Sequence, residues 1–171
     1  MEIATDGLSL LYSPSFDFVG SESFQYTLED NNGLKDSATV TVFVQPDLAQ
    51  IRLGFADIND GSPITQISVG EQFLVQGFVK DLREFGTGVF AAYTDVEYPS
   101  SAATVEGVIF YGADYPNGRS GDTSTPGLVD EVGAFDGIDR LGPDEKLLFA
   151  VPMRAREAGI FEFEPNQADI L

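Results

Sequence analysis

The chain contains no cysteine, histidine or tryptophan. Without cysteine it has no disulfide bond, no thiolate ligand for zinc and no cysteine nucleophile. Without histidine it has no Ser-His-Asp triad, no HExxH zinc motif and no imidazole general base. An enzyme would be restricted to carboxylate, lysine or tyrosine chemistry, or to metals that prefer oxygen ligands. No motif expected for such catalysis is present, so we expect a protein that is not an enzyme.

Basic residues are also scarce. The chain has 9 lysines and arginines against 28 aspartates and glutamates, a formal net charge of −19. Such a charge repels phosphate backbones and anionic lipid surfaces, so we expect no nucleic-acid partner. No apolar run is long enough to span a bilayer, so we expect no membrane insertion, and no signal peptide is visible at the N-terminus. The excess carboxylates suit either a solvated acidic surface or bound divalent cations.

What the chain does contain is a series of short apolar runs separated by glycine and proline turns. The hydrophobic content of 43%, with 12% aromatic residues, is enough to fill a packed core. Two segments meet near Gln45-Pro46-Asp47. We therefore predict an all-β protein with two parts, residues 1–46 and residues 48–171.

The first part predicts one β-hairpin. Apolar and polar residues alternate at period two in residues 23–28 and again in residues 38–44. The sequence between them, residues 29–33, is rich in Asp, Asn and Gly and predicts a turn. A further short strand is expected upstream. Because three strands cannot close a sandwich, this part looks incomplete as a domain.

These residues carry a family resemblance. The motifs Tyr12-x-Pro14, Phe18-x-Gly20, Ser23-Phe24-x-Tyr26, Asp30-x-x-Gly33 and Ala38-Thr39-Val40-Thr41-Val42 occur in that order. Their order and spacing resemble the second half of a bacterial cadherin-like, immunoglobulin-like repeat. The resemblance implies that the chain starts inside a repeat of a longer protein. Such repeats are extracellular stalk or adhesion modules, so an extracellular or cell-surface location is implied.

The second part also reads as β structure. Strands are expected at residues 51–55, 64–69, 73–79, 88–98, 105–110, 146–151 and 159–163. The stretch of residues 114–137 is expected to be a long connection, in which residues 128–135 could form one or two helical turns. About seven or eight strands with Gly and Pro turns indicate a β-sandwich or jelly roll.

A second resemblance covers residues 50–100. The pattern I-x-L, then I-x-V-G-E-x-F-x-V-x-G-F-V-x-D, then G-V-F-A-A-Y-x-D-V-x-Y resembles the opening of a cohesin-type sandwich. The residues that match its last strand are Gly88, Ala91 or Ala92, Asp95, Val96 and Tyr98, followed by Pro99. The resemblance implies a flattened, nine-stranded jelly roll close to some carbohydrate-binding modules. It also implies a partner protein of the dockerin type, which is a small, calcium-loaded helical domain.

The stretch of residues 114–137 supplies the candidate metal ligands. Its hard oxygen donors are Asp114, Asn117, Asp122, Asp130 and Glu131. Calcium binds six to eight such oxygens in irregular geometry, so calcium is the cofactor that this composition favours. The alternative is a surface loop with solvated carboxylates.

Two tyrosines near the same stretch are candidate ligand-binding residues. Tyr111 and Tyr115 could stack against a polysaccharide, which would make the chain a carbohydrate-binding module. Sugar-binding faces often use tryptophan, which is absent. The alternative is that both tyrosines anchor the stretch to the fold.

Overall fold

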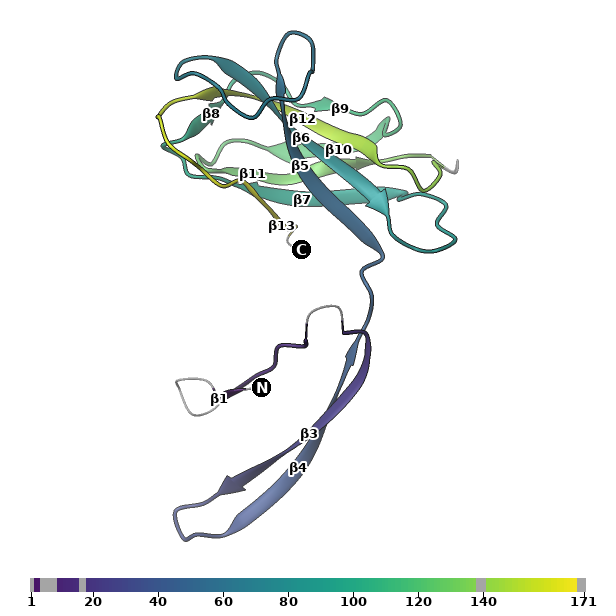
Figure 1. Ribbon diagram of the computed structural model, residues 1–171, viewed down its shortest axis with the longest axis vertical. Helices are drawn as coiled ribbons and strands as arrows, with labels where there is room; N and C mark the ends of the chain where they lie inside the picture. Colours follow the sequence, from purple (N-terminus) through teal and green to yellow (C-terminus); the bar gives the residue numbers. More distant parts are fainter. Residues whose placement is uncertain (1, 4–8, 16–17, 138–140, 169–171) are drawn as a thin grey trace. The chain divides into compact units, whose positions relative to one another are not determined.

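The protein is described here by a computed structural model that covers residues 2–3, 9–15, 18–137 and 141–168 (Figure 1). The described residues form β-strands and connections, with no helix among them. The all-β prediction is therefore confirmed. The chain divides into two compact units, Met1–Asp47 and Leu48–Leu171, next to the predicted junction.

The first unit consists of two small antiparallel sheets. Strand β1 (Glu2–Ile3) pairs with β2 (Leu10–Leu11), and β3 (Gly20–Glu29) pairs with β4 (Lys35–Val44) in a hairpin without a break in register. At the hairpin turn, the Asp30 carboxylate accepts hydrogen bonds from the backbone N–H of Asn32 at 2.8 Å and of Leu34 at 2.9 Å. These bonds replace backbone pairing within the turn. The predicted hairpin is confirmed.

The two faces of this hairpin differ in polarity. One face has cross-strand polar pairs, with Ser23 bonded to Thr41 at 2.9 Å and an ion pair between Lys35 and Glu29 at 3.1 Å. The other face is apolar, and the partly exposed Phe24 and Val40 lie opposite each other on it. None of the first unit's side chains for which burial is described is fully buried. A two-stranded hairpin by itself encloses little core.

The second unit is a two-layer β-sandwich, which confirms the predicted fold class (Figure 1). One sheet has the strand order β10-β11-β7-β13. The other has the order β5-β6-β12-β8, and β9 also pairs with β12. The strands of the unit are β5 (Ala49–Asp57), β6 (Gln72–Asp81), β7 (Ala91–Glu97), β8 (Ala103–Val105), β9 (Phe110–Tyr111), β10 (Asn117–Asp122), β11 (Leu128–Phe135), β12 (Lys146–Ala155) and β13 (Glu164–Gln167).

The core lies between these two sheets. Alternate residues of β6 face inward, and the central strand β12 contributes Leu148, Phe149, Val151 and Met153, all fully buried. Strand β6 has a glycine, Gly77, directly opposite Phe149 in β12. The absence of a side chain at Gly77 makes room for the Phe149 ring, because an added Cβ would lie 2.3 Å from it. The paired strands β6 and β12 of this sheet therefore pack closely, because a small residue on one strand faces a large residue on the other.

The prediction of a long connection over residues 114–137 is wrong. The stretch contains β10 and β11, which form an antiparallel pair in the four-stranded sheet. Residues 128–135, where one or two helical turns were considered possible, are strand β11, and Val129, Val132 and Ala134 within it are fully buried. The sequence did not reveal this strand, because a shift in register between Val129 and Val132 interrupts the alternation of buried and exposed residues.

Three smaller strand predictions were also wrong. Residues 64–69, where a strand was expected, form no strand and belong to the β5–β6 connection. The strand expected at residues 105–110 is replaced by the separate strands β8 and β9 on the same neighbour, β12. Residues 159–163 form no strand, and the strand of that region is β13, which begins one residue later. Strand β13 has no apolar alternation of its own and is defined by its pairing with β7.

Candidate functional site

The outer face of the four-stranded sheet carries a concentration of carboxylates. On β7, Thr94 and Val96 point into the core, so that Asp95 and Glu97 point outward. The neighbouring strands add acidic residues at matching positions, because Glu164 lies opposite Glu97. We call this surface the acidic sheet face, and its carboxylates are Asp95, Glu97, Asp122, Asp130, Glu131 and Glu164.

The charges of the two sheets have opposite signs. Strands β7, β11 and β13 contain no lysine or arginine, and β10 contains only Arg119. That arginine donates a hydrogen bond from Nε to the carbonyl of Tyr115 at 3.2 Å and lies over the Tyr111 ring. The five-stranded sheet, in contrast, holds basic residues on β5, β6 and β12, namely Arg52, Lys80, Lys146 and Arg154. A cationic partner would be attracted to the acidic sheet face.

The backbone holds part of this face in a fixed arrangement. Between Val129 and Val132 the register of β11 against β7 shifts, and Glu131 adopts a φ of 48°. Its N–H donates a hydrogen bond of 2.8 Å to Oδ1 of Asp95. A β-bulge of this kind redirects side chains, and it fixes the position of the Asp95 carboxylate.

Aromatic rings lie beside the carboxylates on the same sheet. The Tyr93 hydroxyl donates to the carbonyl of Gly118 at 2.6 Å, which ties β7 to β10. The ring of Phe135 stacks on that of Phe90 with centroids 5.8 Å apart, and the Phe90 side chain is 54% exposed. Exposed aromatic groups beside charges are typical of recognition surfaces.

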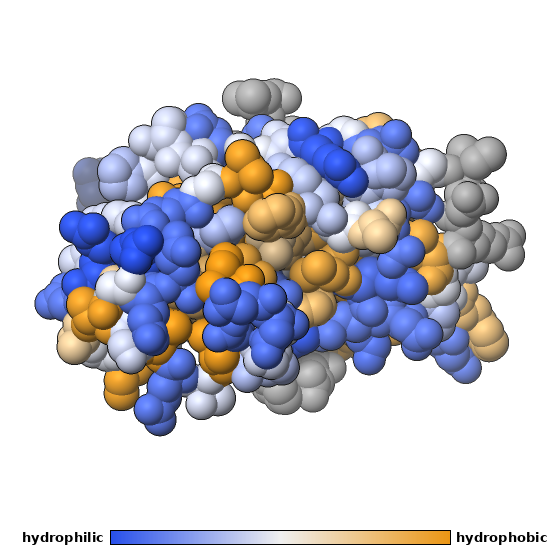
Figure 2. All heavy atoms as spheres, turned by 90° about the horizontal axis from the view of Figure 1, so that it is seen from above, coloured by the Kyte–Doolittle hydropathy of each residue, from blue (hydrophilic) through white to orange (hydrophobic). Residues whose placement is uncertain are grey.

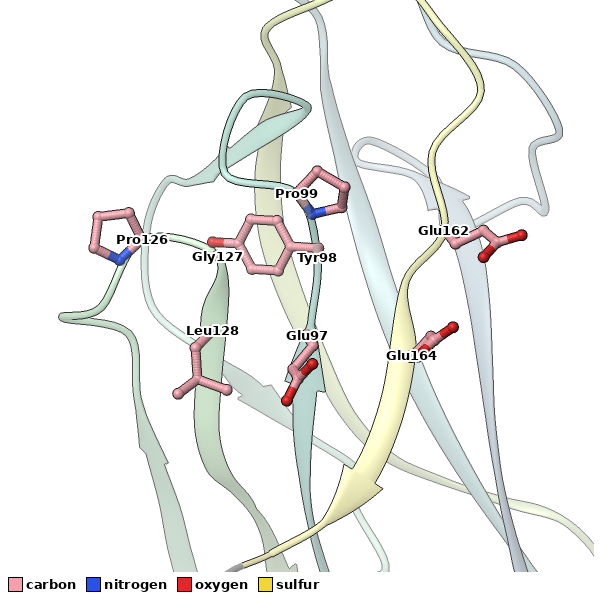
Figure 3. A pocket seen from close by; sticks show the side chains of 8 residues that line it. All are labelled: Glu97, Tyr98, Pro99, Pro126, Gly127, Leu128, Glu162 and Glu164. Atoms are coloured by element: carbon pink, nitrogen blue, oxygen red, sulfur yellow. The ribbon is translucent and has the colours of Figure 1, made fainter. Parts of the chain in front are cut away.

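A hollow of about 400 Å³ lies at the end of this face, between β7, β11 and β13. Figure 3 shows Glu97 and Glu164 on adjacent strands, with the side chain of Glu162 directed away from Glu97. Tyr98 is buried and stacks on Phe163 at 5.4 Å, and its burial raises the pKa of its phenol. The hollow thus has acidic groups at its rim and a buried aromatic ring beneath.

A second hollow is lined mainly by apolar residues. It has a volume of about 660 Å³ and is lined by residues of the β5–β6 connection, including Ile64, together with Phe55, Phe73 and Phe163. Exposed apolar side chains also occur elsewhere, and Figure 2 shows several among hydrophilic ones on one face of the molecule. Thr65, Gln66, Ser68 and Glu157 add polar groups to its lining.

The predicted calcium ligands are distributed over four places. Asp122 and Asp130 lie opposite each other at one end of the β10–β11 pair, and Asn117 lies at the other end, opposite Phe135. Glu131 lies in the bulge described above. Asp114 lies in the turn before β10 and pairs with Lys146 at 3.7 Å.

The Asp122 carboxylate is already engaged in a local turn. It accepts hydrogen bonds from the Ser124 N–H at 2.8 Å and the Ser124 hydroxyl at 3.0 Å, and these lower its pKa. Within the described ranges, no group of three or more acidic, histidine or cysteine side chains is arranged to hold a metal ion. Calcium binding by the chain stays a prediction.

The two candidate sugar-binding tyrosines attach β10 to the rest of the sandwich. Tyr115 is fully buried, its hydroxyl donates to the carbonyl of Val89 at 3.0 Å, and its burial raises its pKa to about 12. Its ring therefore has no face open to a sugar. Tyr111 is half-buried, and its hydroxyl donates to the carbonyl of Ser120 at 2.7 Å.

Glu97 and Glu164 of the acidic sheet face were not among the residues named from the sequence, and Asp95 was named only for its match to a family pattern. Tyr93, Asp95 and Glu97 alternate with buried residues, so a period-two pattern on β7 could have placed them on one outward face. No comparable pattern marks Glu164, because β13 has no buried residues. Its contribution depends on the pairing of β13 with β7.

Comparison with known proteins gives one match. Residues 1–43 match the family model of a bacterial Ig domain, which supports an Ig-like character for the first unit. No curated protein and no solved structure matches the chain. In the part of the chain that the structure describes, no helix has the length and apolar character needed to cross a membrane.

Proposed function

We propose that this chain is a non-catalytic extracellular module that binds a partner protein through the acidic sheet face. The proposal rests on one observation, which is that several negatively charged carboxylates lie on adjacent, hydrogen-bonded strands. Such a face is preorganised, because its side chains extend from a rigid sheet. The proposal applies to the second unit, and the first unit would act as a structural module.

Two findings support an extracellular binding module. Residues 1–43 match a bacterial Ig domain, and domains of this class often occur outside the cell. The described part of the second unit has nine strands in two antiparallel sheets, which is the strand number that the cohesin resemblance implies. We therefore propose a cohesin-like module whose partner is of the dockerin type.

The charge of the face defines the partner further. A surface that presents Asp95, Glu97 and Glu164 requires lysine or arginine on the facing surface, because like charges would cost binding energy. Phe90 and Phe135 could supply apolar contact beside these ion pairs. The ion pairs between the acidic sheet face and its partner should chiefly raise the rate of association and make that rate dependent on salt concentration.

Binding of calcium-loaded dockerin modules, measured by calorimetry, tests this proposal. The double variant Glu97→Lys/Glu164→Lys should weaken binding at least tenfold. The matched control Asp144→Lys/Glu157→Lys makes the same change in charge at exposed positions outside the acidic sheet face and should bind like the parent protein. Equal weakening by both double variants would exclude a specific face, and no binding to any dockerin would exclude the cohesin-like role.

A second candidate function is carbohydrate binding. It is favoured by the exposed ring of Phe90 next to Phe135 and Tyr93, since an accessible ring can stack on a sugar. Tyr111 remains a candidate contact because it is only half-buried. Binding on a glycan array that is lost in Phe90→Ala or Tyr111→Ala would favour this function over protein binding.

A further inference from the structure

A different surface of the second unit, the free edge of the five-stranded sheet, has the properties of a peptide-binding site. Strand β5 is the terminal strand of that sheet and pairs on one side with β6. The pairing runs from Ala49 opposite Asp81 to Asp57 opposite Phe73 without a shift in register. The opposite edge of β5 is therefore straight.

The backbone groups on this edge can be assigned from neighbouring hydrogen bonds. The Phe55 carbonyl accepts from the Ile64 N–H at 2.9 Å, and the Asp57 N–H donates to the Ser62 carbonyl at 2.8 Å. Both groups therefore point away from β6. Because backbone groups alternate in direction along a strand, those of Ile51 and Leu53 also point away from β6.

These groups are left without backbone partners in the described structure. No backbone bond from a connection in the described ranges reaches Ile51 or Leu53. The Leu53 carbonyl has one long contact, from Nη1 of Arg52 at 3.4 Å. Unpaired edge groups of this kind are a template for another strand.

The part of the edge at Ile51 and Leu53 also lacks the usual features that prevent strand addition, whereas the β5–β6 connection covers the edge from Phe55 to Asp57. Strand β5 contains no proline and no bulge, and Ile51 and Leu53 are half-buried against the core. Its one basic residue, Arg52, is held by two hydrogen bonds to Glu145, at 2.9 Å and 2.7 Å. The Arg52 guanidinium also lies 4.5 Å from the centroid of the Phe78 ring, so its charge is engaged within the molecule.

We propose that the β5 edge binds an extended segment of a partner protein as an added strand. The free groups recur every second residue, about 7 Å apart, which is a spacing that another extended backbone matches. Apolar side chains at alternate positions of the segment would cover Ile51 and Leu53. Because Glu145 neutralises Arg52, the basic residue of β5, the net charge of −19 favours a segment with basic rather than acidic residues between them, and it opposes pairing with a second copy of the chain. This proposal is independent of the acidic sheet face.

Fluorescence polarisation with a labelled peptide of alternating valine and lysine tests the proposal. Two N-methylated forms of the peptide, each methylated along one edge only, separate strand addition from general attraction. At least one form should bind tenfold more weakly than the parent peptide, because it has lost the donors that face β5. Equal binding of all three peptides would overturn the proposal, and this result does not depend on any change to the protein.

A variant of the protein provides a second test. Leu53→Pro removes an N–H that points away from β6, so the β5–β6 pairing is retained, whereas Leu53→Val keeps both the N–H and an apolar side chain. Leu53→Pro should bind the parent peptide at least tenfold more weakly, and Leu53→Val should bind it normally. Unchanged binding by Leu53→Pro would overturn the proposal. A dimer of the unliganded protein in light scattering that Leu53→Pro abolishes would overturn the assignment to a partner segment and assign the edge to a second copy.

Discussion

The contact between Gly77 and Phe149 allows the packing of the sandwich to be tested quantitatively. A Cβ atom at residue 77 would lie 2.3 Å from Cζ and 2.4 Å from Cε1 of the Phe149 ring. The ring is fully buried and cannot move toward solvent. Overpacking of a core costs about 1–3 kcal/mol, so Gly77→Ala should lower the free energy of unfolding by about 2 kcal/mol.

The partner variant Phe149→Ala removes the ring and leaves a cavity. Such a truncation costs about 3–5 kcal/mol. In the double variant, the methyl group that Gly77→Ala introduces would occupy part of the cavity and meet no ring. The double variant should therefore be more stable than the sum of the single effects predicts, by about 1–3 kcal/mol of coupling.

Urea denaturation followed by far-UV circular dichroism would measure these free energies for the full chain. The midpoint should shift while the slope of free energy against urea stays constant, because the same surface is exposed on unfolding. Phe149→Leu provides a milder background in which Gly77→Ala should cost less than in the parent protein. The packing argument would be refuted if Gly77→Ala were neutral, or if the two effects were additive.

Three further predictions concern ionisation, a buried hydroxyl and metal binding. The Arg83 guanidinium, at 2.6 Å from the Asp81 carboxylate, holds the pKa of that buried group well below its usual range. This interaction stabilises the fold at pH values above the unfolded-state pKa of about 3.9, and the stabilisation is lost as the pH falls toward the folded-state pKa. At pH values below about 4, the melting temperature should therefore decrease more steeply for the parent protein than for Asp81→Asn. Tyr115→Phe should lower the free energy of unfolding, measured in urea, by about 1 kcal/mol, because the variant loses the hydrogen bond to the Val89 carbonyl. If Tyr115→Phe abolished binding to a glycan, a purely structural role of Tyr115 would be contradicted. If calcium binds the native state, a chelator should lower the melting temperature, because a ligand at a hundredfold excess over its Kd stabilises the native state by about 2.7 kcal/mol. Identical melting curves with and without chelator would exclude calcium binding.

Local patterns in the sequence were sufficient to predict several parts of this fold. The period-two alternation around an Asn-Gly turn predicted the β3–β4 hairpin, because its two strands are adjacent in sequence and its register follows from the turn. The apolar run of residues 73–79 likewise predicted β6. The short apolar runs separated by glycine and proline turns indicated an all-β chain.

The candidate site depends on pairings between distant parts of the chain. Residues 114–137 were rich in glycine and acidic residues, which favours a loop, yet β11 is a central strand because the Asp130-Glu131 bulge keeps both Val129 and Val132 in the core. The acidic sheet face exists only because β13 and β11 flank β7, which brings Glu164 beside Glu97 and Asp130 beside Asp95. Charge on a residue can be read from the sequence, but its neighbours across a sheet are set by non-local hydrogen bonds. The tertiary structure therefore decided which carboxylates share a surface and placed Tyr115 in the core.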